Sequence, residues 1–151
     1  MKNMIKKIFT LLSFGFALFA LPTQTFADTS KYGQQKVVYH INYDSLERQI
    51  GALGNAQNQI DAVGESNMET TIVMHGKGLT LLQVAKTNGD LASKIKALKM
   101  QGVKFAVCNK TMEKQKLTVA DLFDATQQDV VPSGVAELSY LQSKGYTYLR
   151  P

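Results

Sequence analysis

Apolar positions follow two different periods along the chain. Short runs rich in β-branched and aromatic residues predict five strands, at 36–42, 70–75, 103–107, 129–131 and 146–149. Apolar residues at helical spacing predict helices at 46–63, 91–100, 119–123 and 134–143. Strands that alternate with helices favour right-handed crossovers and a mostly parallel sheet, so residues 28–151 are expected to form one α/β domain.

Polar residues indicate where the predicted helices begin. Asp44 or Ser45 can cap the first helix, Asp90 the second, and Ser133 the last. Residues 79–84 are apolar but few, which fits either one helical turn or a covering loop. The polar residues after position 108 are expected to form a loop.

The first 27 residues have the pattern of a secretory signal peptide. Positive charge near the start is followed by 14 uncharged residues at 8–21, fewer than the ~20 that a membrane-spanning helix needs. Small residues precede Asp28, where cleavage is expected. The sequence therefore predicts an exported, most simply periplasmic, protein with no membrane attachment after cleavage.

Charge excludes one class of partner. The chain has a net charge of +5, but three lysines lie in the expected signal peptide. Without them, 14 of the 17 basic residues remain against 12 acidic ones, a net charge of +2. No remaining stretch combines clustered basic residues with aromatic ones, so we expect no nucleic-acid partner.

The reactive side chains follow the predicted strands at the point where each ends. His40 and Asn42 end the first strand, His75 the second, and Cys108 the third. Ligands of open parallel sheets bind outside the carboxyl ends of the strands. The sequence therefore places both histidines and the single cysteine of the chain at one edge of the sheet.

Cys108 has two interpretations. A single cysteine forms no disulfide within its own chain and belongs to no CxxC motif. It is either a buried, inert residue, as free cysteines often are, or a reactive thiolate whose pKa is lowered by a neighbouring cation such as Lys110.

The histidines and glycines are less specific. His40 and His75 fit structural roles as well as roles as orienting or basic groups. Together with Cys108 they have the ligand types of a metal site, but spacings of 35 and 33 residues match no metal motif, so we expect no metal and no cofactor. Gly76 and Gly78 suggest an anion-binding loop, which a tight turn explains equally well.

Several segments together resemble the DsrE/DsrF-like family, in particular its exported branch of intracellular sulfur oxidation proteins. They are KVVYHIN (36–42), LGNAQNQI (53–60), IVMHGKGL (72–79), VKFAVCN (103–109) and VVPSGVAELSYLQSKGYTYLRP (130–151). The resemblance implies a flavodoxin-like three-layer sandwich with a five-stranded, mainly parallel sheet. It also implies a homotrimer or homohexamer, and a strand-end cysteine, here Cys108, that carries sulfur.

We therefore expect a sulfur carrier or sulfurtransferase-like protein that binds sulfane sulfur or thiosulfate on Cys108. His75 and His40 are the candidates for orienting or basic groups, and the expected ligand-binding residues are Gly76, Gly78, Asn109 and Lys110. The partners would be other copies of the chain, a sulfur donor or acceptor protein, or a small sulfur anion. The alternative is a non-catalytic, oligomeric α/β binding module with a structural cysteine. The carrier hypothesis also predicts that the Cys108 sulfur is reachable from solvent.

Overall fold

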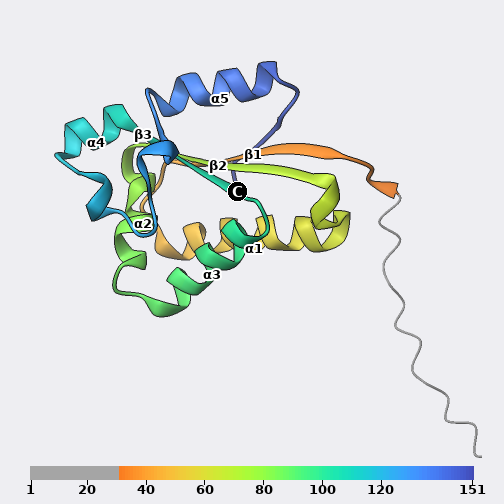
Figure 1. The fold of residues 1–151 in the computed structure, drawn as a ribbon, viewed down its shortest axis with the longest axis horizontal. Coiled ribbons are helices and arrows are strands. Elements are labelled where there is room, and N and C mark those ends of the chain that lie inside the picture. Colours follow the sequence, from red (N-terminus) through yellow and green to blue (C-terminus); the bar gives the residue numbers. More distant parts are fainter. Residues whose placement is uncertain (1–30) are drawn as a thin grey trace, which may run out of the picture.

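A computed structural model describes residues 31–151, which form a five-stranded sheet. The sheet lies between two helical layers (Figure 1). The predicted signal peptide lies outside the described residues. All strand pairs are parallel, and the strand order is β4-β3-β2-β1-β5. This is the predicted α/β class with the predicted number of strands. The strands are β1 (Gln35–Ile41), β2 (Met68–Met74), β3 (Lys104–Cys108), β4 (Val130–Val131) and β5 (Thr147–Leu149).

The helices connect the strands in chain order, and short 3₁₀ turns lie beside them. Ser45 caps the first helix and Ser133 the last, as their hydroxyls accept from the N–H groups of Arg48 and Ala136. The helices are α1 (Leu46–Val63), α2 (Thr80–Ala85), α3 (Gly89–Met100), α4 (Asn109–Gln115) and α5 (Gly134–Ser143).

Strand order explains the two unequal layers. From β1 to β4 the chain moves across the sheet in one direction, so right-handed crossovers place α1, α2 and α3 on one face. The last crossover returns across the sheet to β5 and places α5 on the opposite face (Figure 1). The first face holds the larger apolar core, and α5 covers a smaller one built on Val38, Val73 and Ala106.

Three local expectations differ from the structure. Residues 109–115 form α4 rather than a loop, because Thr111 and Met112 are buried against the rest of the domain. Asn88, not Asp90, caps α3, since its side-chain oxygen accepts from the N–H of Leu91. Residues 119–123, expected as a short helix, contain only the 3₁₀ turn Val119–Asp121. Residues 79–84, expected as either a helical turn or a covering loop, lie within a 3₁₀ turn and α2 and pack three apolar side chains into the core. Within residues 31–151, no helix has the length and apolar character needed to cross a membrane.

Candidate functional site

The sheet register brings His40, His75 and Cys108 onto one face. Val73 and Ala106 are register partners that lie under α5. Side chains alternate between faces along a strand, so His75 and Cys108, each two residues further on, point to the same side. His40 is the register partner of Val73 and shares that face. The structure therefore places both histidines and the cysteine at the carboxyl edge of the sheet, on the α5 side.

Cys108 is a buried residue that lines an open pocket. Only 4% of the residue is exposed, which is less than the carrier hypothesis predicts for a rim position. The pocket has a volume of about 430 Å³ and gives the cysteine its connection to solvent. The other residues around it are His75, Gly76, Lys77, Lys110, Thr111, Lys114, Gln115, Ser133 and Val135.

Polar groups around the sulfur favour the thiolate. Burial by itself would raise the pKa of the Cys108 thiol. The N–H groups of Gly134, Thr111 and Lys110, together with the Thr111 hydroxyl, outweigh burial and hold the pKa below its ordinary value. These N–H groups belong to the first turns of α4 and α5, where backbone donors lack partners within the helix.

Gly134 allows α5 to approach the cysteine closely. A Cβ atom at position 134 would lie 2.9 Å from the Cβ of His75 and 3.2 Å from the Cβ of Cys108. Cβ atoms in real structures essentially never lie closer than 3.0 Å to such a neighbour, so the 2.9 Å contact would force a shift. The absence of a side chain at residue 134 therefore lets its N–H face the sulfur.

The two histidines contact each other directly. Nε2 of His40 lies 2.7 Å from Nε2 of His75, and the rings stack with centroids 4.8 Å apart. On its other side, Nδ1 of His40 lies 2.6 Å from the hydroxyl of Tyr148 in β5. A row of three polar side chains thus runs from the sheet edge to the cysteine pocket.

Both histidines are held in the neutral form. Burial, then the neighbouring His75, then the positive charge of Arg150 lower the pKa of His40 to about 4. Burial and Arg150 also lower the pKa of His75. Arg150 is fixed in this position because its guanidinium donates twice to Oδ1 of Asn42, at 3.1 and 2.9 Å.

The four expected ligand-binding residues have different positions. Gly76 lines the pocket, and its N–H donates to the Thr111 hydroxyl at 2.8 Å. Lys110 also lines it, but its ammonium pairs with Glu113 at 3.1 Å, so its contribution beside the sulfur is its backbone N–H.

Gly78 and Asn109 lie outside the lining of the pocket. Gly78 is buried, and a Cβ there would lie 2.0 Å from the carbonyl oxygen of Ile41, which makes it a packing residue. The side-chain amide of Asn109 donates to Glu113 at 2.8 Å.

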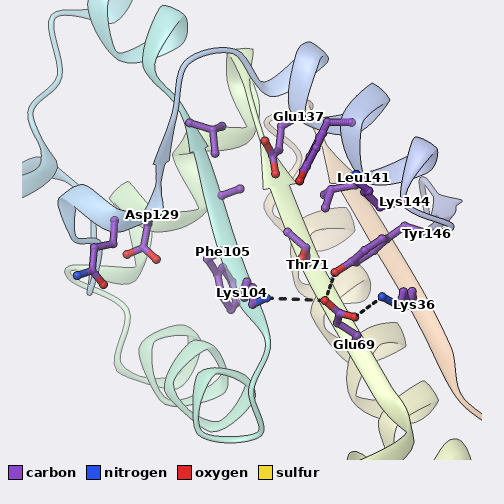
Figure 2. Close-up of a pocket in the computed structure, with 14 residues that line it drawn as sticks. Lys36, Glu69, Thr71, Lys104, Phe105, Asp129, Glu137, Leu141, Lys144 and Tyr146 are labelled. Atoms are coloured by element: carbon purple, nitrogen blue, oxygen red, sulfur yellow. Dashed lines mark hydrogen bonds and ion pairs between the residues drawn. The ribbon is translucent and has the colours of Figure 1, made fainter.

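A larger hollow lies on the α5 face of the sheet and extends from the starts of β1, β2 and β3 to Val131 at the end of β4. It has a volume of about 610 Å³ and contains an ion-pair cluster in which Lys36 and Lys104 contact Glu69 (Figure 2). The hydroxyl of Tyr146 donates to the same carboxylate. Its lining contains neither cysteine nor histidine, whereas Cys108 and His75 both line the smaller pocket at the carboxyl edge.

No group of three or more histidine, cysteine, aspartate or glutamate side chains in residues 31–151 has metal-binding geometry.

Comparison with known proteins assigns the family. The model of the DsrE/DsrF-like family matches residues 36–151, which include every described helix and nearly all of the sheet. The chain belongs to the DsrE/DsrF-like family. This membership links it to proteins of sulfur relay.

A solved structure supports the fold of this DsrE-like chain. The protein of unknown function MTH1491 from Methanobacterium thermoautotrophicum is 26% identical, with a TM-score of 0.68. The alignment covers 78% of this chain and 100% of that one. A search of curated proteins found no match.

Sequence reasoning missed four residues of the site in this DsrE-like chain. Thr111 and Gly134 contact the cysteine environment, and Tyr148 and Arg150 act on the histidines. Strand alternation gave a usable signal for Tyr148, because it is the register partner of Val38 and shares the face of His40. This signal can be used only when β5 is known to pair with β1, and the apolar pattern does not predict that pairing.

Proposed function

We propose that the protein is a sulfur carrier in which Cys108 accepts a sulfane sulfur atom from an anionic donor. The observation that carries the proposal is the thiol itself. It lies at an open pocket, and N–H groups from two helix starts lower its pKa. A thiolate is the nucleophilic form of cysteine, so these contacts prepare the sulfur for attack.

The lining of the pocket favours an anionic donor. Lys77, Lys110 and Lys114 line it, and no aspartate or glutamate does. Lys77 and Lys110 are paired with acidic residues, whereas Lys114 has no ion pair among residues 31–151. Thiosulfate and the persulfides of small thiols are anions that fit this charge.

The proposed step balances without an oxidant. The Cys108 thiolate attacks the outer sulfur of thiosulfate, the sulfur–sulfur bond of thiosulfate breaks, and sulfite leaves with the bonding electron pair. The products are a persulfide anion on Cys108 and sulfite. With a persulfide donor, the leaving group is the corresponding thiolate. His75 lines the same pocket and is the base for the fraction of Cys108 that begins as a thiol.

Two experiments test the proposal. Native protein should react with iodoacetamide near neutral pH faster than a model thiol of pKa ~8.5. Incubation with thiosulfate or an alkyl persulfide should add the mass of sulfur, about 32 Da per atom, to the wild type but not to Cys108→Ser. Labelling that occurs only after denaturation would instead identify a structural cysteine in a non-catalytic binding module.

Two lysine substitutions test whether the sulfur donor is an anion. Lys114→Gln should weaken the donor's apparent affinity severalfold at low salt, and high salt should reduce the difference. The control is Lys94→Gln, because Lys94 lies on α3 outside the Cys108 pocket. Equal affinities in all three proteins would remove the argument for an anionic donor.

We further infer that the carrier works as a homotrimer or homohexamer, the assemblies that the family resemblance implies. In support, α5 covers its face of the sheet with Val135 and Tyr140 exposed to solvent. Light scattering at several protein concentrations tests this inference, and a concentration-independent monomer would contradict it.

A further inference from the structure

Tyr148, His40 and His75 form an unbranched chain of hydrogen-bonding side chains. The Tyr148 hydroxyl contacts Nδ1 of His40 at 2.6 Å, and the two Nε2 atoms are 2.7 Å apart. Tyr148 is 38% exposed on the edge strand β5, whereas His75 lines the Cys108 pocket. These three side chains therefore connect solvent at the sheet edge with the pocket that contains the Cys108 thiol.

In each of these two hydrogen bonds, either partner can be the donor. A neutral imidazole has one N–H and one bare nitrogen, so a contact between two Nε2 atoms requires opposite roles in the two rings. When Tyr148 donates to His40, His40 donates to His75, and Nδ1 of His75 carries a proton. When both contacts reverse, Nδ1 of His75 is bare and Tyr148 accepts from His40. Among residues 31–151, Nδ1 of His75 has no hydrogen-bond partner, and His75 lines the pocket that contains Cys108.

We propose that Tyr148, His40 and His75 are a proton relay between the Cys108 pocket and solvent at β5. This rests on the sulfur-carrier function proposed above. During loading, the proton of the Cys108 thiol enters the relay at Nδ1 of His75. The Nε2 proton of His75 then passes to Nε2 of His40, the Nδ1 proton of His40 passes to the Tyr148 oxygen, and the hydroxyl proton of Tyr148 passes to water.

The reverse transfer completes the cycle. When the thiolate of an acceptor attacks the outer sulfur, Cys108 is left as a thiolate, and it regains a proton along the same path. All three relay members are neutral before and after each transfer, so no charge is stored in the buried site. The burial of both rings and the charge of Arg150 favour this neutral state. His40 and Tyr148 are thus positioning residues that act through His75.

Nitrogen NMR can test the relay without a sulfur donor. The chain contains only two histidines, so a preparation without a polyhistidine tag shows four ring nitrogens. Tyr148→Phe removes the hydroxyl and should change the tautomer populations of both rings, including His75, which Tyr148 does not touch. Tyr140→Phe is the matched control, because Tyr140 lies exposed on α5 and should leave all four signals unchanged. Unchanged His75 signals in Tyr148→Phe would overturn the relay.

Loading kinetics provide the second readout. Tyr148→Phe should load Cys108 from an alkyl persulfide at least threefold more slowly than wild type, and free imidazole should restore the rate by carrying the proton instead. Rates equal to wild type, or a loss that imidazole does not restore, would count against the relay. If Tyr148→Phe does not fold, His40→Gln interrupts the same chain. Failure of the wild type to accept sulfur would refute the carrier function, and the NMR result would still decide the relay.

Discussion

Gly134 lies against Cys108 so closely that a Cβ atom at residue 134 would be 3.2 Å from the Cβ of the cysteine. The contact joins the start of α5 to the end of β3, although the two residues are 26 positions apart in the sequence. It explains how a backbone N–H from α5 faces the sulfur.

Gly134→Ala should therefore change both stability and reactivity. The added methyl must displace α5 or His75, which should cost about 1–3 kcal/mol in the free energy of unfolding. The displaced N–H should also raise the pKa of Cys108 and slow its alkylation by iodoacetamide. Urea unfolding and the pH dependence of alkylation measure the two effects. Gly51→Ala is the matched control, because Gly51 is exposed on α1 and a Cβ there meets nothing within 4 Å. It should lose no stability and leave the alkylation rate unchanged.

Thr111 provides a separate test of the thiolate environment. Its hydroxyl lowers the pKa of Cys108 and accepts from the N–H of Gly76. Thr111→Val keeps the shape of the side chain but removes the hydroxyl. The lost hydrogen bond to the thiolate is worth ~1 kcal/mol, so alkylation at neutral pH should slow about threefold to tenfold. Thr111→Ser should retain the wild-type rate. Equal rates in all three proteins would show that the hydroxyl does not affect the thiol.

A substitution at Gly78 tests whether this residue of the 76–78 loop has a packing role or a ligand-binding role. A Cβ at this position would lie 2.0 Å from the Ile41 carbonyl oxygen, which belongs to the backbone and cannot move aside easily. Gly78→Ala should cost roughly 3 kcal/mol or more, measured by urea unfolding. Gly89→Ala is the control, because a Cβ there meets nothing within 4 Å. It should be neutral or stabilising by up to ~1 kcal/mol. A Gly78→Ala protein as stable as wild type would contradict the packing role.

Apolar periodicity was sufficient to predict the α/β class and the five strands. It failed at α4, because the sequence NKTMEKQ contains one large apolar residue, Met112, and therefore has no recognisable helical stripe. Tertiary burial of Thr111 and Met112 decides the structure of this segment. Local pattern alone cannot supply that information.

The site was predictable where it depends on strand ends and unpredictable where it depends on strand order. His40, His75 and Cys108 end three strands, so their shared edge follows from a parallel sheet. The contact between Tyr148 and His40 joins residues 108 apart in the chain and requires β5 to pair with β1 rather than β4. Nothing in the apolar alternation of residues 147–149 distinguishes these two partners.

Export is a prediction about residues that the structure does not describe. The tripartite pattern of residues 1–27 should direct secretion, with cleavage after Ala27. N-terminal sequencing of protein from the native compartment should begin at or within a few residues of Asp28. Recovery of the full-length chain from the cytoplasm would contradict this prediction.

His40 should make the stability of the protein depend on pH in the acidic range. Burial, His75 and Arg150 lower the pKa of His40 to about 4 in the folded chain, below the usual value of ~6.5 expected in the unfolded chain. Between these values the unfolded state binds more protons than the folded state, so the free energy of unfolding falls as pH falls. The contribution of His40 is complete above pH ~6.5 and is lost as pH approaches about 4.

Urea unfolding at several pH values between about 7 and 5 should show this decrease. The carboxylates with lowered pKa values, such as Glu69 and Asp121, lose their contributions mainly at lower pH, so this window reports on the histidines. His40→Gln should flatten the slope. The remaining slope should come from His75, whose pKa is lowered in the same direction. An identical slope in wild type and His40→Gln would mean that His40 is not held neutral by the fold, and the electrostatic basis of the Tyr148–His40–His75 relay would then fail.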